Sequence, residues 1–344
     1  MNSYYVQNHS YIQEGGVRFD ILKFVLAMLI VVLHSSVAPR WAHPVLRLAV
    51  PLFFMMTSYF FHLKLKGAVD NNSRKECLRK YVTRNAQLYL FWSIALLPSV
   101  VLLHLSWFND GFVNALINIV KSFFITGFFP ASWFVLSSVY AVVIIFVLSK
   151  WLKNGWIFFI AFLFYLVALL DSNYGGLLSE QARNQLNILG IRHALNLPAA
   201  MIWMVIGKVF AEKPFILSNK PLYSMLVVSA LLYYVEFFII EHFGWSIHTD
   251  CFLMSIPLCI LIFIAIGQSA DFNCKYALWM RKSSVIVYCT HFTIIRLLRL
   301  VSLHVLWLPS LAIYGITLII CFFMAGLIIY LSENTHIKIL RKAY

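Results

Sequence analysis

The sequence predicts an all-α, polytopic integral membrane protein: a bundle of about ten transmembrane helices with both termini in the cytoplasm. Hydrophobic residues make up 62% of the 344 positions and charged residues only 12%, roughly half the charged share of a soluble domain. Apolar runs of membrane-spanning length recur along the whole chain. Basic residues concentrate in alternate connections between these runs. Together these observations exclude an ordinary soluble domain.

The apolar runs give ten predicted spans, each long enough to cross the hydrocarbon layer. An eleventh stretch, 112–129, contains Asn114, Asn118 and Lys121 and is predicted to be an interfacial or re-entrant helix. The predicted spans are 18–36, 47–65, 85–105, 131–151, 155–171, 194–211, 221–241, 251–268, 283–303 and 310–331.

The basic residues orient this map. With the amino terminus inside, about three quarters of the 27 basic residues fall on the inner side. A predicted polar inner loop, 64–84, contains seven of them. This bias accounts for most of the formal net charge of +14 and suits contact with the lipid bilayer. Nucleic-acid binding is not expected, because it needs the charge on one soluble face.

No linker or repeat divides the chain, so we expect a single membrane domain, 18–331. A cytoplasmic tail, 1–17, precedes it and a basic cytoplasmic tail, 332–344, follows it. The outer polar segment 171–193 fits either a solvated loop or a cover over an outward cavity. The first span has features of a signal peptide. Its acidic Asp20 and the nine spans that follow indicate instead that it stays uncleaved as a membrane span. The six cysteines are scattered and are predicted to be apolar fillers, without a disulfide framework or a metal site.

The first span, "DILKFVLAMLIVVLH" (20–34), contains three ionisable side chains in an apolar helix. The eleven steps from Lys23 to His34 amount to three turns plus about 20°, so Asp20, Lys23 and His34 share one face. The helical rise places His34 about 16 Å beyond Lys23, near the middle of a hydrocarbon layer about 30 Å thick. Such a stripe is typical of a water-filled cavity that a proton-transferring histidine faces. The alternative is a histidine that bridges two helices through hydrogen bonds.

This stretch resembles the first-span signature of the membrane-bound acyltransferase family 3, which includes O-antigen and other surface-glycan acetylases. The signature is an aspartate, a basic residue three positions on, and a histidine after ten more residues. Asp20, Lys23 and His34 occupy these positions. Arginine is commoner at the second position. Lys23 keeps the positive charge but lacks the planar guanidinium that binds a phosphate or carboxylate through two hydrogen bonds.

The resemblance extends over about 18–331 through four more segments in the family's order. "VPLFFMMTSYFF" (50–61) is similar to the second span, with Thr57-Ser58-Tyr59 where the family has serine, glycine and an aromatic residue. "RKYVTRNAQLYLFW" (79–92) resembles the basic entry to the third span. The other two are "ASWFVLSSVYAVVI" (131–144) and "IVYCTHFTII" (286–295); the residues matched in these last three segments are Arg84, Trp133, Phe134, Tyr288 and His291.

The resemblance implies a transfer reaction at a bacterial inner membrane. An acyl group, expected to be acetyl, moves from cytoplasmic acyl-CoA to a hydroxyl of a cell-envelope glycan or its lipid-linked precursor. Acetyl-CoA is then a donor substrate, and no permanently bound cofactor or metal is expected. His34 is the predicted catalytic residue, either as a general base or as a transient acyl-imidazole.

The other candidate residues have both functional and structural interpretations. Lys23 and Arg84 are predicted to bind the phosphates of coenzyme A, or else they serve topology alone. Asp20 is expected to pair with one of these two cations. Supporting roles are predicted for Tyr288 and His291, which share a helix face with Ser284. His291 either binds the thioester or acceptor or only packs in the bundle.

Three further side chains have less specific interpretations. Trp133 is expected to pack in the bundle or to lie at the membrane interface. Arg296 and Arg299 either hold an anionic acceptor or reach the outer lipid headgroups.

A transporter or flippase of a small polar or glycolipid substrate is the main alternative. Inverted repeats and paired broken helices would favour it, and the sequence shows neither. A non-catalytic scaffold would not need the aligned stripe. The glycan, the hydroxyl and the oligomeric state do not follow from the sequence.

Overall fold

The structure, a computed structural model, describes residues 16–109, 111–188, 196–270 and 272–344. All regular secondary structure in these ranges is helical, so the all-α prediction is confirmed. Helices are the expected solution in lipid, because each pairs its own backbone N–H and C=O groups. The predicted tail 1–17 lies outside the described residues apart from its last two positions.

Every predicted span coincides with a helix or a bent pair of helices. Helices α5 and α6 occupy the third predicted span and bend by 64° where they meet. The matching elements are α2 (Val17–Ser35), α4 (Ala49–Lys66), α5 (Asn71–Ala95) with α6 (Leu97–Leu103), α8 (Trp133–Leu148), α9 (Asn154–Leu170), α12 (Asn196–Glu212), α13 (Asn219–Phe243), α14 (Ser255–Gln268), α15 (Ala277–His304) and α16 (Ser310–Asn334).

Length and charge decide which helices could cross a membrane unaided. Within the described ranges, four helical segments are long and apolar enough, or five if α5 and α6 form one span. Helix α2 carries Arg18, Asp20 and Lys23 near its start. Helices α8, α9 and α14 have 16, 17 and 14 residues, roughly 21–26 Å against a layer about 30 Å thick. The membrane class is therefore supported, while the count of ten and the cytoplasmic termini stay predictions.

Three further α-helices in the described ranges lie mainly outside the predicted spans. Helix α7 (Phe112–Lys121) continues into a π-helical turn, Ser122–Thr126, in the stretch predicted to be interfacial or re-entrant. Helix α10 (Glu180–Ile188) lies in the polar segment that was predicted to be on the outer side. Short α3 (His43–Arg47) precedes α4.

The predicted inner loop 64–84 is wrong in its extent, because most of it is helix. Helix α5 begins at Asn71, so only 67–70 connects it to α4. The Asp70 carboxylate accepts the backbone N–H of Ser73 at 2.6 Å, which satisfies a donor of the first helical turn. Hydrogen bonds from Ser73 lower the pKa of Asp70. Lysine and arginine are good helix formers, so the basic run continues the helix.

The described chain forms two compact units. The first unit comprises residues up to Phe19, Arg47–Leu78 and Tyr140–Cys274, and the second comprises Asp20–Leu46, Arg79–Val139 and Lys275–Tyr344. All the predicted site residues belong to the second unit: Asp20, Lys23, His34, Arg84, Trp133, Tyr288 and His291.

In the first unit, α12 packs against both α4 and α9. The approach of α12 to α4 is close at Gly207, where an added methyl would overlap the backbone carbonyl oxygen of Met55. The Ser58 hydroxyl donates to the carbonyl of Met204 across the same interface. The glycine missing from Thr57-Ser58-Tyr59 thus has a counterpart on the facing helix.

A buried acid in the first unit has a structural role. Glu236 of α13 is 8% exposed and accepts the backbone N–H groups of Leu253 and Met254 at 2.6 and 2.7 Å. The Tyr174 hydroxyl donates to the same carboxylate at 2.6 Å. Burial and this bond raise the pKa of Tyr174, so it keeps its proton. Glu236 therefore fixes the chain just before α14.

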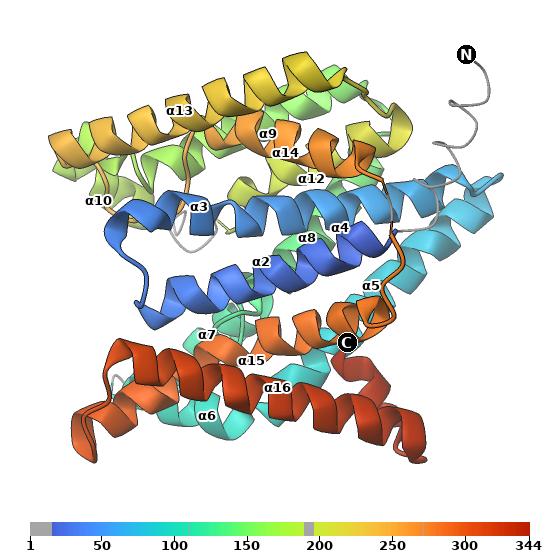
Figure 1. Cartoon of the computed structure of the whole chain (residues 1–344). Coiled ribbons are helices and arrows are strands. Elements are labelled where there is room, and N and C mark those ends of the chain that lie inside the picture. The colour runs from blue at the N-terminus through green and yellow to red at the C-terminus, as the bar shows by residue number, and fades with distance from the viewer. Residues whose placement is uncertain (1–15, 110, 189–195, 271) are drawn as a thin grey trace. The chain divides into compact units, whose positions relative to one another are not determined.

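In the second unit, α15 and α16 pack side by side as a helical hairpin (Figure 1). The predicted tail 332–344 is folded against this unit. Trp92 donates its indole N–H to the carbonyl of Ala343 at 3.0 Å. The Tyr344 and Ser332 hydroxyls lie 2.7 Å apart. The Lys282 ammonium lies 5.0 Å from the centre of the Tyr344 ring.

Replacing Gly207 with alanine should destabilise the first unit by about 1–3 kcal/mol, because the new methyl group forces α4 and α12 apart. Thermal unfolding of the detergent-purified protein measures the effect. Gly267→Ala on α14 is the control, since its added methyl meets nothing within 4 Å and should be neutral or stabilising by up to about 1 kcal/mol. Equal melting temperatures for both variants would contradict the packing argument.

Candidate active site

One end of α2 carries a cluster of charges. The Asp20 carboxylate is 7% exposed and lies 3.7 Å from the Lys23 ammonium and 3.6 Å from the Arg281 guanidinium of α15. Arg84, on α5, is also close enough for its charge to act on Lys23. Lys23 and Arg281 therefore flank one carboxylate, and Arg84 adds a third cation that acts on Lys23. The excess positive charge of this cluster favours an anionic ligand.

Arg281 was not among the predicted site residues. The sequence indicated Lys23 or Arg84 as the partner of Asp20, and the structure shows Lys23 together with Arg281. A basic residue at the start of a span was assigned to topology alone. Its position 261 residues after Asp20 gives no local signal that the two side chains meet.

The other end of α2 brings two histidines together. The ring centres of His34 and His291 lie 5.5 Å apart. Phe292 packs its ring edge-on against His34, with 4.4 Å between centres. His34 is partly exposed, whereas His291 is 1% exposed. The first-span histidine is therefore not sealed within the bundle, and it has a buried imidazole beside it.

Backbone contacts define the protonation of His291. Its Nδ1 lies 3.0 Å from the carbonyl oxygen of Val287 and 2.8 Å from that of Tyr288. Carbonyl oxygens only accept hydrogen bonds, so Nδ1 carries the hydrogen and Nε2 of the neutral ring is an acceptor. That Nε2 is buried and has no hydrogen-bond partner in the described part of the chain. Such unsatisfied groups are uncommon, and a functional role is one reason to retain one.

Aromatic side chains connect His291 to α8. The Tyr288 ring lies 5.9 Å from His291 and 5.3 Å from Phe134. Trp133 lies next along α8, with its ring 6.4 Å from that of Phe134. The segments "ASWFVLSSVYAVVI" and "IVYCTHFTII" therefore meet through Phe134 and Tyr288. The Ser284 hydroxyl donates to the backbone carbonyl of Arg281.

Arg299 of α15 holds the end of α2 just after its histidine. Its Nη2 donates to the carbonyl of His34 and to the hydroxyl of Ser36, both at 2.8 Å. Ser36 has a φ of 58°, a left-handed conformation that is costly for residues other than glycine. An arginine bonded to a final helical carbonyl also suits the helix dipole. The structure therefore gives Arg299 a positioning contact beside the two roles considered from sequence.

The contacts at both ends show that α2 and α15 run in the same direction. Asp20 near the start of α2 meets Arg281 near the start of α15, and His34 near the end of α2 meets Arg299 near the end of α15. His34 and His291 face each other between these two contacts.

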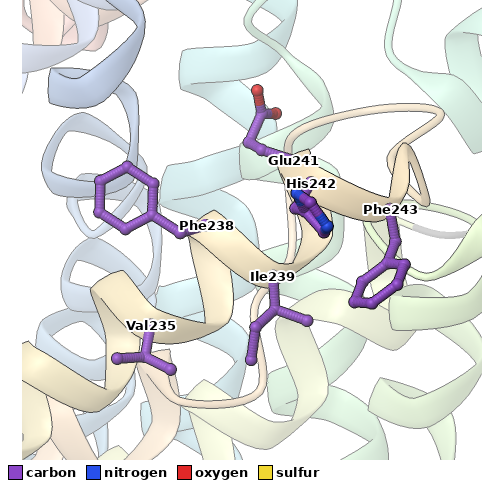
Figure 2. A pocket seen from close by; sticks show the side chains of 6 residues that line it. All are labelled: Val235, Phe238, Ile239, Glu241, His242 and Phe243. Carbon is purple, nitrogen blue, oxygen red and sulfur yellow. The ribbon is translucent and has the colours of Figure 1, made fainter.

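A surface hollow on α13 has a different character. Figure 2 shows the six side chains that line it, all from this helix: Val235, Phe238, Ile239, Glu241, His242 and Phe243. Four are apolar and well exposed, including Phe238 at 57% and Phe243 at 61%. Such a face suits contact with lipid better than a polar substrate. The six cysteines are free, and the described residues contain no group of three or more His, Cys, Asp or Glu placed to hold a metal.

Comparison with known proteins defines the class. The model of acyltransferase family 3, described as an acyltransferase domain, matches residues 17–326. The chain therefore belongs to the acyltransferase family 3, as its sequence motifs indicated.

Two further comparisons are less informative. The chain is also similar to an amino-acid racemase of Enterococcus faecalis, 27% identical over 176 residues. That match covers 47% of this chain and 23% of the racemase, so the chain corresponds to less than a quarter of that protein's length. No solved structure matches the chain.

Arg299→Ala should loosen the last turn of α2, because it removes the bonds to His34 and Ser36. We expect backbone amides in the turn around His34 to exchange with deuterium roughly tenfold faster, corresponding to about 1.5 kcal/mol for a bond to a charged group. Hydrogen–deuterium exchange with mass spectrometry measures this rate. Arg296→Ala, three residues earlier on α15, is the control. Unchanged exchange in Arg299→Ala would show that the guanidinium does not hold the turn.

Proposed function

We propose that this protein is an integral membrane O-acyltransferase of the bacterial cytoplasmic membrane. It moves an acyl group, acetyl in the first instance, from cytoplasmic acyl-CoA to a hydroxyl of a cell-envelope glycan or its lipid-linked precursor. Family membership supports the acyltransferase class. The acyl-CoA donor and the residue roles are argued from the arrangement of the second unit, whereas the acetyl group and the glycan acceptor rest on the motif resemblance. The principal observation is that α2 carries a cation cluster at one end and a partly exposed histidine beside a second histidine at the other.

The cation cluster suits the donor. Coenzyme A is polyanionic, and in our proposal Lys23, Arg84 and Arg281 bind its phosphates through charge-assisted hydrogen bonds. Asp20 orients Lys23 and Arg281 and leaves the cluster with a net positive charge. The flexible arm of coenzyme A separates its phosphates from the thioester. A reacting group is therefore expected some distance from the cations, and His34 lies about 16 Å along the helix from Lys23.

The histidine end suits the transfer. In our proposal His34 is the reacting residue, as general base or acyl carrier. Phe292 and Tyr288 shape the surroundings of the two imidazoles. Trp133 packs against Phe134 on α8, and Phe134 in turn contacts Tyr288. Arg299 fixes the backbone of His34.

His34→Ala should abolish transfer, with a loss of at least about 100-fold for removal of a catalytic base or nucleophile. Inverted membrane vesicles, which expose the cytoplasmic face, receive labelled acetyl-CoA, and the label in the glycan and lipid-linked sugar fractions is measured. His104→Ala, a histidine variant at the end of α6, should retain activity. Equal incorporation by wild type and His34→Ala would remove His34 from the chemistry. Uptake of a free sugar or amino acid without acyl transfer would instead favour a transporter.

Neutralising the cation cluster should weaken donor binding more than turnover. We expect Lys23→Gln, Arg84→Gln and Arg281→Gln each to raise the KM for acetyl-CoA about tenfold, equivalent to about 1.4 kcal/mol, with a smaller change in kcat. Initial rates over a range of acetyl-CoA concentrations test this in the same vesicles. Lys75→Gln, an exposed lysine on α5, is the charge-matched control. If all four variants showed the same KM, the phosphate-binding role would be wrong.

A further inference from the structure

The unsatisfied nitrogen of His291 bears on how the two histidines divide the reaction. A buried acceptor that lacks a donor destabilises the folded state, because the nitrogen has lost its hydrogen bond to water. Since the Val287 and Tyr288 carbonyls hold Nδ1, the ring cannot turn over to satisfy Nε2 without breaking those contacts. The lone pair of this nitrogen is therefore available to a hydrogen-bond donor from outside the described side chains.

The ring beside His291 indicates which donor that is. His62 of the first unit also leaves its Nε2 without a hydrogen-bond partner in the described residues, and its ring packs against Phe61. His291 packs instead against the partly exposed imidazole of His34, 5.5 Å away between ring centres. A hydroxyl hydrogen bond spans about 2.8 Å. One oxygen atom that reaches an acyl group on His34 therefore also comes within reach of His291.

We infer that His291 is the general base of acyl transfer and that His34 is the acyl carrier. This inference rests on the proposed acyltransferase function and makes its mechanism definite. When His34 carries the acyl group, the ring nitrogen that is bonded to the acyl carbon cannot also accept the proton of the hydroxyl that attacks this carbon. A second imidazole with a lone pair on Nε2 removes that conflict.

The transfer then has two balanced steps. A ring nitrogen of His34 attacks the carbonyl carbon of acyl-CoA, the N–C bond forms, and the C–S bond breaks. The thiolate leaves with its electron pair and takes a proton from water. The acceptor hydroxyl oxygen then attacks the same carbon, its proton passes to Nε2 of His291, and His34 leaves as a neutral imidazole. His291 finally returns its proton to water, so the net reaction neither consumes nor releases a proton.

His291→Gln separates the two steps. Purified protein in detergent is exposed to labelled acetyl-CoA without a glycan acceptor, and protein-bound label that hydroxylamine releases is measured. We expect wild type and His291→Gln both to become labelled and His34→Ala to stay unlabelled. When membranes that contain the native glycans are added, wild type should lose its label to the glycan fraction. His291→Gln should retain it at least about 100-fold longer.

The control and the contrary outcomes are distinct. Thr293→Val removes from α15 another buried oxygen that has no hydrogen-bond partner among the residues the structure describes. This variant should behave as wild type, which distinguishes a general base from a general effect on packing. Labelling of His291→Gln also shows that the variant is folded. If His291→Gln lost its protein-bound label to the glycans at the wild-type rate, the assignment of His291 as general base would be wrong. If wild type labelled the glycans but neither wild type nor any variant carried protein-bound label, His34 would not be an acyl carrier. The proposed acyltransferase function would still hold. Absence of glycan labelling by wild type would remove the proposed function itself.

Discussion

A polar or charged side chain inside an apolar bundle is stable only when a partner or water satisfies it, and this constraint organises α2. At the start of the helix, Asp20 lies between Lys23 and Arg281, which offsets the cost of burying its charge. At the end, the carbonyl of His34 accepts from Arg299. Both arginines come from α15. The position of the histidine therefore depends on ion pairing and hydrogen bonding to this single neighbouring helix.

The first unit shows how buried polar groups look when they serve structure. Glu236 accepts three hydrogen bonds. Lys208 contacts both Glu212, at 2.8 Å, and Asn154. The groups around these charges are mutually satisfied, as expected for polar networks that stabilise a core. The histidine pair of the second unit differs from these two networks. His291 is buried, and its Nε2 has no hydrogen-bond partner among the described residues, a feature that it shares with His62 of the first unit. Only His291, however, has a second, partly exposed imidazole beside it.

Hydrophobic run length and helical spacing predicted most of the fold. The ten apolar segments correspond to helices, and the spacing of Asp20, Lys23 and His34 placed them on a single helix. The extent of α5 was missed because hydropathy cannot separate a basic loop from a basic helix that leaves the membrane. The capping contact of Asp70 with Ser73 was the local signal that could have located its start.

The candidate site was predictable in its residues but less so in its contacts. Motif resemblance identified His34 and His291, and it did not indicate that their rings are neighbours. Arg281 was assigned to topology, and Arg299 to an anionic acceptor or to the outer lipid headgroups. Their actual partners were missed because a partner more than 250 residues away leaves no periodic trace in the sequence. The close approach of α12 to α4 at Gly207 was not predicted for a similar reason. The glycine lies on α12, whereas the family pattern has it on α4.

The two arginine contacts at either end of α2 make its length a fixed spacing. Asp20 and His34 are separated by fourteen residues, about 21 Å along a helix. Sliding α2 past α15 by a single turn, about 5.4 Å, would break both contacts and carry one imidazole away from the other. The register between the two helices is therefore locked from both sides. The parallel pair of α2 and α15 therefore resists displacement of one helix along the axis of the other.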